Sequence, residues 1–172
     1  RQMCIETAFD VSKDAVKITA KRLPKATFFV GDIWARWPVL SEAVDVLLNI
    51  FAPTSFDEMR RVVRWDGQVF KIFAGLDHLV ELRNRYGLIG VERGKQERYQ
   101  RLALSAFRQV SVRSLRWQCR LSDREIGALI AMGPNARHQT SIEISKSEEL
   151  VTFDVVMLNV LTLNVKRQAQ SA

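Results

Sequence analysis

Two acids and one polar loop follow short apolar segments of the sequence, where side chains can meet a ligand. Asp10 and Asp32 each come after such a segment, and the N-I-F-A-P stretch at 49–53 interrupts a third. A carboxylate at the carboxyl end of a parallel strand can accept hydrogen bonds from ribose hydroxyls or from an adenine amino group. One such acid is more often a helix N-cap or a loop residue. When two acids lie at equivalent ends of neighbouring strands, a nucleoside site is as plausible as a pair of helix caps or loop residues.

The elements that must position these residues alternate between strand and helix. Apolar runs bounded by Gly, Pro and Asp predict strands near 4–10, 27–31, 44–50, 68–74, 107–117 and 150–165. Helices are expected at 13–22 with Ser12 as N-cap, at 56–63 with Gly67 ending that unit, at 77–85 with Asp77 as N-cap, at 92–106, and from a capping box at Ser122 to Met132. This alternation is typical of an α/β domain, whose ligands lie beyond the carboxyl ends of the strands.

Length and composition favour one domain without a transmembrane helix. The chain has 172 residues, and its apolar runs are far shorter than a membrane span. The sequence shows no apolar secretory segment. Its two cysteines, Cys4 and Cys119, fit neither a disulfide framework nor a zinc site. We therefore expect a cytoplasmic protein without a metal centre.

Positive charge is concentrated in residues 93–137. This segment holds ten basic residues, nine of them arginine, against three acids, so it accounts for the net charge of +7 of the whole chain. Arginine suits phosphate binding and base stacking better than lysine does. The pattern favours RNA as a partner, carried by Arg108, Arg113 and Arg116, with a solvated basic face as the alternative.

Several other reaction classes are disfavoured. The chain contains neither the G-x-x-x-x-G-K-[ST] loop of nucleotide hydrolases nor the G-x-G-x-x-G turn of hydride-transfer enzymes. Its two histidines, His78 and His138, are isolated, and a lone histidine is more often structural than catalytic.

Six segments carry a resemblance to a known family. They are F-D-V-S-K-D-A-V-K at 9–17, F-F-V-G-D at 28–32, N-I-F-A-P at 49–53, E-M-R-R-V at 58–62, H-L-V-E-L at 78–82 and M-G-P-N-A-R-H at 132–138. The sequence resembles class I S-adenosylmethionine-dependent methyltransferases, and more narrowly the large-subunit ribosomal RNA guanine-N1 methyltransferases that include the tylosin-resistance enzymes. The resemblance runs from Phe9 to about Val165. The combination of N-I-F-A-P with H-L-x-E-L is its most specific part.

The resemblance implies a site and a cofactor. Asp10 would bind the ribose hydroxyls of S-adenosylmethionine, and Asp32, with Ile33 beside it, would face the adenine. Asn49, Phe51 and Pro53 would form the loop where the methyl group meets the target base, with Asn49 also near the cofactor. The implied partner is ribosomal RNA. No chemistry is assigned to Arg60, Arg61 or His78.

Departures from the family pattern matter as much. The family's zinc module is absent, and so is its first strand with the D-x-G-C-G-type turn that approaches the methionine part of the cofactor. The sequence therefore resembles the C-terminal two-thirds of such an enzyme, a Rossmann-like sheet flanked by helices and lacking its first strand. In this fold that strand lies mid-sheet, so two strand edges should face an empty slot. Either these strands pair directly, or a partner fills the slot, or the piece is poorly stable. The last strand should insert between its neighbours and be antiparallel to them.

Three functions remain open on the sequence. The first is a ribosomal RNA guanine-N1 methyltransferase or its fragment. The second is a remnant that binds RNA without catalysis. The third is a methyltransferase of the same fold acting on a small molecule, which would leave the arginines unexplained. The oligomeric state is also open, with a homodimer as one option.

Overall fold

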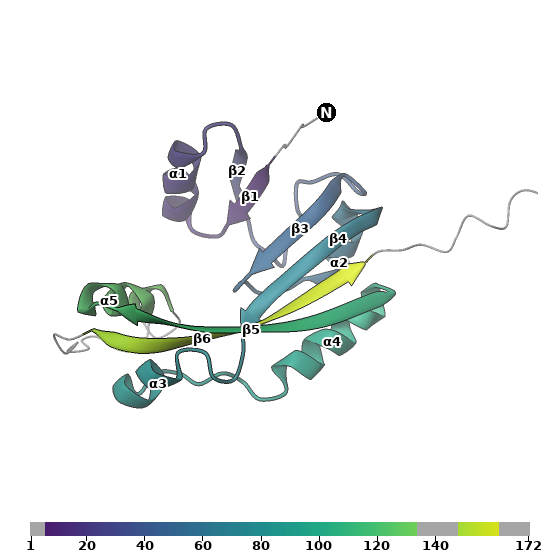
Figure 1. The fold of residues 1–172 in the computed structure, drawn as a ribbon. Helices are drawn as coiled ribbons and strands as arrows, with labels where there is room; N and C mark the ends of the chain where they lie inside the picture. Colours follow the sequence, from purple (N-terminus) through teal and green to yellow (C-terminus); the bar gives the residue numbers. More distant parts are fainter. Residues whose placement is uncertain (1–5, 134–147, 162–172) are drawn as a thin grey trace, which may run out of the picture.

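The computed structural model describes residues 6–133 and 148–161. Its elements, in chain order, are β1 (Thr7–Asp10), α1 (Lys13–Arg22), β2 (Thr27–Val30), β3 (Val44–Ile50), α2 (Phe56–Val62), β4 (Val63–Ala74), α3 (Val80–Tyr86), α4 (Lys95–Ala106), β5 (Gln109–Leu121), α5 (Asp123–Met132) and β6 (Glu149–Leu161) (Figure 1). The expected α/β alternation is confirmed. No helix among the described residues is both long enough and apolar enough to cross a membrane.

Serine side chains begin α1 and α5, as the sequence predicts, and Ser55 begins α2 in the same way. Ser12 accepts a hydrogen bond from the backbone N–H of Ala15 at the start of α1. Ser122 and Glu125 form a complete capping box at the start of α5. These bonds satisfy backbone donors that have no partner inside the helix.

Four strands form the main sheet in the order β3-β4-β6-β5. β3 and β4 are parallel, whereas β6 is antiparallel to both of its neighbours. The insertion of the last strand between its neighbours is therefore confirmed. Val151, Val155, Val156, Leu158 and Val160 of β6 are buried, which explains its nearly uncharged, β-branched sequence.

Strands β1 and β2 form a separate, two-stranded parallel sheet beside the main one (Figure 1). Among the described residues, β1 has no partner on the side away from β2, and β3 has none on the side away from β4. The expected pair of unpaired edges is thus confirmed, and direct pairing of the two strands does not occur. Val46, Leu48 and Ile50 of β3 remain more than half exposed. A second polypeptide segment would be needed to cover them.

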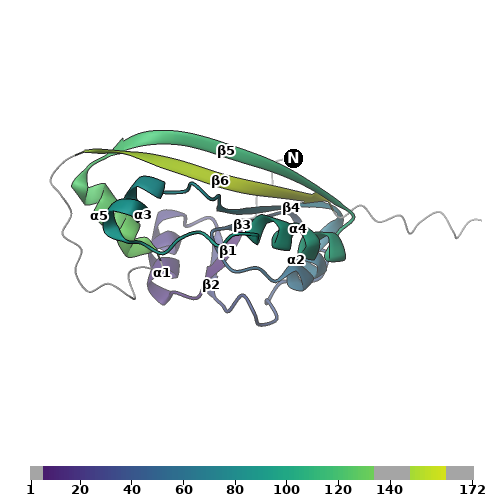
Figure 2. The same cartoon turned by 90° about the horizontal axis from the view of Figure 1, so that it is seen from below.

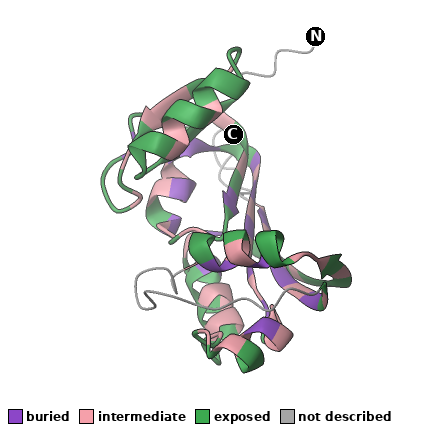
Figure 3. Cartoon of the chain, turned by 90° about the vertical axis from the view of Figure 1, so that its left-hand side faces the viewer, coloured by how far each residue is buried: buried purple, intermediate pink, exposed green. Residues whose placement is uncertain are grey.

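The main core lies between the sheet and two helices. Met59 and Val62 of α2 and Ala103 of α4 pack against Val69 and Leu158, and both helices lie on the same side of the sheet (Figure 2). A smaller cluster joins α3 and α5 to β6, through side chains such as Leu82, Ile126 and Val151. In contrast, α1 has no buried residue (Figure 3). The sheet of β1 and β2 therefore has less buried apolar packing around it than the main sheet has.

Strand β4 is longer than the sequence predicts. The prediction begins this strand at Gln68, after Gly67 has ended the preceding helical unit, but the strand begins at Val63. The pairing with β3 shifts register between Val44 and Val46, at a bulge. A Cβ on Gly67 would lie 2.8 Å from the carbonyl oxygen of Asp45. Gly67 therefore does not end the unit but allows two strands to approach at the bulge.

The predicted N-cap of α3 is wrong. The helix begins at Val80, and its N-cap is Leu79 in the left-handed conformation, without a side-chain cap. The carboxylate of Asp77 instead pairs with Arg116, at 2.8 Å. A tertiary partner has replaced the local one that the sequence suggested.

The remaining strand bounds agree with the predictions within a few residues, except that β5 continues to Leu121. The predicted end of the last strand, at 162–165, lies outside the described residues, as do the motif residues 134–138 and Cys4.

Candidate cofactor and target-base site

Asp10 and Asp32 lie together at the carboxyl end of the smaller sheet. Asp10 ends β1, and its backbone oxygen accepts a hydrogen bond from the N–H of Gly31, next to Asp32. One oxygen of each carboxylate accepts a bond from a nearby backbone N–H, from Ser12 at 2.7 Å and from Trp34 at 2.9 Å. Both acids are exposed. The loop bonds hold the two carboxylates in place while leaving them open to a ligand.

Ile33 belongs to the loop that follows Asp32. Its side chain is partly buried against the main core, and its carbonyl oxygen accepts a bond from the indole N–H of Trp37 at 3.1 Å. Trp37 is buried and packs on Phe9 of β1, with ring centroids 5.1 Å apart. These contacts attach the smaller sheet to the main one.

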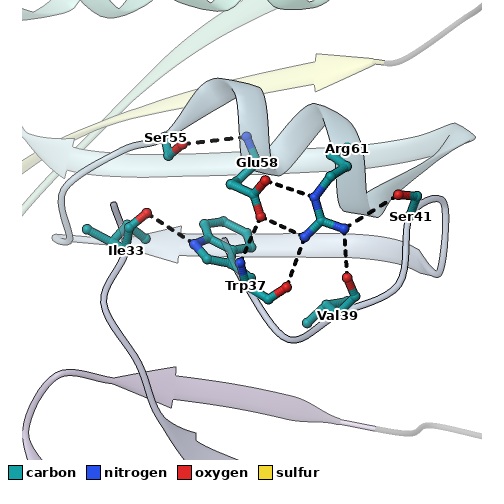
Figure 4. Close-up of polar contacts among 7 residues, drawn as sticks. All are labelled: Ile33, Trp37, Val39, Ser41, Ser55, Glu58 and Arg61. Carbon is teal, nitrogen blue, oxygen red and sulfur yellow. Dashed lines mark hydrogen bonds and ion pairs between the residues drawn. The ribbon is translucent and has the colours of Figure 1, made fainter. Parts of the chain in front are cut away.

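An ion pair on α2 fixes the same loop (Figure 4). Arg61 donates to both carboxylate oxygens of Glu58, at 2.8 and 2.6 Å, and to the carbonyl oxygens of Trp37 and Val39. Glu58 also accepts a bond from the N–H of Trp37. The hydrogen bond from Arg61 lowers the pKa of Glu58 to about 2. Arg61 is thus a structural residue that positions the loop carrying Asp32.

A buried lysine holds the loop at residues 49–53 through hydrogen bonds. Lys71 of β4 is 1% exposed, and its ammonium group donates to the side-chain oxygen of Asn49 and to the carbonyl oxygen of Ala52, both at 2.5 Å. The amide nitrogen of Asn49 donates to the carbonyl oxygen of Pro53 at 2.9 Å. Burial lowers the pKa of Lys71 to about 8, and Lys95 adds to the effect. In this structure the side chain of Asn49 fastens the loop.

Phe51 is the most prominent side chain of that loop. It has a positive φ of 50° and is 55% exposed. Its backbone N–H donates to the carbonyl oxygen of Ile72 at 3.0 Å, which fixes the turn. Thr54, directly after the loop, has a buried hydroxyl oxygen without a hydrogen-bond partner among the described residues.

The predicted RNA-binding arginines are exposed on or beside β5. Arg108 lies between α4 and β5, and Arg113 and Arg116 are within the strand. The guanidinium of Arg116 pairs with Asp77, although both side chains stay about half exposed. The structure places these arginines on a different element from the two acids.

Sequence reasoning missed Lys71 and the pair Glu58–Arg61. The sequence signal for Lys71 is a single lysine inside the apolar run V-F-K-I-F of a strand predicted to be buried. A charge there must find partners. Glu58 and Arg61 are spaced as neighbours on one helix face, but their loop partners could be found only in the fold.

No group of three or more His, Cys, Asp or Glu side chains that could hold a metal ion occurs in 6–133 and 148–161. The candidate ligand-binding groups are the two exposed carboxylates and the loop around Phe51.

The fold matches solved methyltransferases. The structure of a provisionally assigned methyltransferase of Bacillus halodurans superposes with a TM-score of 0.59 at 13% identity, covering 92% of this chain and 83% of that one. A SAM-dependent methyltransferase of Thermotoga maritima gives 0.55 at 13% identity, covering 92% and 73%. The chain has the class I methyltransferase fold. No family model matches the sequence.

Sequence relatives point to one group of methyltransferases within this fold. The chain is 34% identical over 137 residues to the 23S rRNA (guanine(748)-N(1))-methyltransferase of Streptomyces fradiae, and 37% identical over 131 residues to a protein of Micromonospora griseorubida provisionally named 23S rRNA (guanine-N1) methyltransferase. It is a homologue of these methyltransferases. The matches cover 80% and 76% of this chain, but only 49% and 44% of the relatives. The chain therefore spans about half the length of the curated relatives it matches.

Proposed function

We propose that the chain forms the adenosine-binding and target-base part of an S-adenosylmethionine-dependent methyltransferase that acts on a guanine N1 of large-subunit ribosomal RNA. The observation that supports this most is the 34–37% identity to proteins of that name. The location follows from the substrate, because ribosomal RNA is cytoplasmic in bacteria. We propose the cytoplasm as the site of action.

The described residues fit the adenosine end of the cofactor. Asp10 at the end of β1 and Asp32 just after β2 present exposed carboxylates, each held by a hydrogen bond within its own loop. Such groups accept hydrogen bonds from ribose hydroxyls and from the adenine amino group. Bound S-adenosylmethionine would supply an activated methyl group. The open side of β1 and β3 lies where a further strand would belong.

The loop at 49–53 is the candidate for positioning the target base. Lys71 and the Asn49 amide hold its backbone, so Phe51 can present a flat apolar surface without reorganisation. Methyl transfer to a ring nitrogen depends mainly on in-line geometry, and a rigid loop supports that geometry. The target guanine must leave its stack to reach such a loop.

A second function, RNA binding without methyl transfer, is supported by one observation. The edges of β1 and β3 are unpaired, so the sheet around the cofactor site is incomplete in the described residues. Such a chain could still bind RNA through its exposed arginines.

Methyl transfer to 23S rRNA separates the two functions. The purified chain would be mixed with the segment of the Streptomyces fradiae relative that it does not match, together with S-adenosylmethionine and unmodified 23S rRNA. N1-methylguanosine blocks the pairing edge of the base, so reverse transcriptase stops beside it. A new stop that requires the chain and is lost with Asp10→Asn supports methyl transfer. RNA binding with no new stop supports the second function.

A further inference from the structure

A row of four aromatic rings runs from the loop at 49–53 to the edge strand β5. Its members are Phe51, His78, Phe153 and Trp117, and successive ring centroids lie 5.4, 5.7 and 5.4 Å apart. We call them the aromatic row. They come from four separate parts of the chain, so the row exists only in the fold.

The backbone holds each ring of the aromatic row in place. Trp117 and Phe153 are cross-strand partners in the β5–β6 pairing, and their rings are nearly parallel, at 9°. The Nδ1 atom of His78 accepts a hydrogen bond from the N–H of Asp154 at 3.3 Å. Burial lowers the pKa of His78, so its ring is neutral at pH 7. The row is thus a rigid, uncharged stacking surface.

Both ends of the aromatic row are exposed. Phe51 is 55% exposed and Trp117 is 47% exposed, whereas His78 and Phe153 are only partly exposed. Phe153 covers one face of the Trp117 indole, because the two rings are stacked. The remaining exposed surface of Trp117 can stack on another flat ring.

An exposed arginine lies on the same face of β5 as Trp117. Arg113 is four residues before Trp117 in the strand, so the two side chains share a face. Arg116 and Arg120 are also exposed but lie on the opposite face, where Asp77 pairs with Arg116. Flat rings with a cation on the same face match the chemistry of a single-stranded nucleic acid, whose bases stack on aromatics and whose phosphates bind arginine. A duplex keeps its bases stacked on each other and cannot use the rings.

We propose that the aromatic row, with Arg113 of β5, binds unpaired nucleotides that flank the target base. A base stacks on Trp117, and the strand leads along the row toward Phe51. This assignment rests on the proposed function, since it takes RNA as the substrate and the loop of Phe51 as the place of the target base.

The test compares tryptophan variants of the full 172-residue chain. Trp117→Ala removes the stacking surface, and Trp117→Phe keeps a flat ring. Trp65→Ala is the matched control. Trp65 is similarly exposed, at 52%, but it lies near the start of β4 and does not belong to the aromatic row. Affinity is measured for a short single-stranded RNA and for the same strand in a blunt duplex. Thermal unfolding of each variant checks that the fold is kept.

We expect Trp117→Ala to weaken single-strand binding about 5- to 150-fold, the range known for base–aromatic stacking. Trp117→Phe should weaken it less, and Trp65→Ala should match the wild type. Duplex binding should be unchanged. Single-stranded RNA should also quench the tryptophan fluorescence of the wild type but not that of Trp117→Phe.

Three results would overturn the proposal. If Trp117→Ala binds single strands as Trp65→Ala does, the row has no role, while RNA binding and the proposed function stand. If Trp117→Ala weakens single-strand and duplex binding equally, the effect is not stacking. If the wild-type chain does not bind single-stranded RNA, both the row and the RNA substrate of the proposed function fail.

Discussion

At the scale of single residues, a buried lysine and one ion pair hold the two loops that carry the candidate site. Lys71 holds the loop of Phe51, and the pair Glu58–Arg61 holds the loop after Asp32. Folding lowers the pKa of both Lys71 and Glu58, so the stability of the chain depends on the protonation of each.

Replacing Lys71 by methionine should change how stability depends on pH. The pKa of Lys71 falls from 10.5 to about 8 in the folded chain. Between these values the unfolded state holds more protons, so the stability of the wild type rises with pH. Relative to Lys71→Met, the free energy of unfolding should rise by up to about 3 kcal/mol from pH 8 to pH 10.5. Urea denaturation across this range measures it. A difference that is constant with pH would show that Lys71 is not buried as a cation.

Replacing Glu58 by glutamine should destabilise the chain at neutral pH by about 1–3 kcal/mol, because Arg61 is left without a charged partner. The pKa of Glu58 is depressed to about 2, so its contribution is present above the ordinary value of 4.5 and disappears as pH falls toward 2. The two proteins should therefore converge in stability between pH 4.5 and pH 2. Glu42→Gln, an exposed acid on the nearby loop, is the control. Equal effects of both substitutions at pH 7 would contradict the anchoring role.

The sequence predicted the places of Asp10 and Asp32 because short strands that end in an acid are visible as a local pattern. It could not predict the partners of Lys71, because Asn49 and Ala52 lie on another strand and its loop. Asp77 failed as a cap for the same reason, since its partner Arg116 is distant in sequence. The binding roles of Asp10, Asp32, Ile33, Asn49, Phe51 and Pro53 stay predictions.

At the scale of elements, strand β3 has one covered face and one open face. Leu47 packs against the main core, whereas Leu48 is 62% exposed. The apolar run at 44–50 is typical of a strand buried on both faces, so the sequence predicted the covered face of β3. It did not predict the open face, because the exposure of that face depends on which segments pack against the strand.

Neighbouring leucines of β3 give a matched test of this open face. Leu48→Lys should change the free energy of unfolding by less than about 0.5 kcal/mol, as surface substitutions do. Leu47→Lys places a charge against the core and should cost at least about 1 kcal/mol. Chemical denaturation of the two variants measures both. Equal costs would mean that the outer face of β3 is covered in solution.

The basic segment binds RNA, on our proposal, through exposed arginines on β5 and at its start. Replacing Arg108, Arg113 and Arg116 together by alanine should weaken RNA binding and flatten its salt dependence, by about 0.7 in slope for each phosphate that is no longer neutralised. Replacing Lys13, Lys17 and Lys21 of α1 removes the same charge from another exposed surface and is the control. Titrations at several salt concentrations supply the slopes. If both triple variants give the same slope, the arginines form a solvated face.

At the scale of the whole molecule, the chain carries two partial sheets whose unpaired edges belong to one fold. The class I methyltransferase fold is matched over 92% of the chain, and β1 and β3 carry its two unpaired edges among the described residues. The sequence predicted this split because its first apolar segment resembled the second strand of the family. We infer that the described residues hold the adenosine end of the cofactor and that none of them surrounds its methionine end.

Ligand titration of the chain, followed by NMR, tests this inference most directly. Adenosine and S-adenosylmethionine should bind with the same weak affinity, because only their shared part is held. Both should shift the amide signals around Asp10 and Asp32, and Asp10→Ala should abolish both. Micromolar binding of S-adenosylmethionine that adenosine does not match, or shifts that leave Asp10 and Asp32 unaffected, would contradict it.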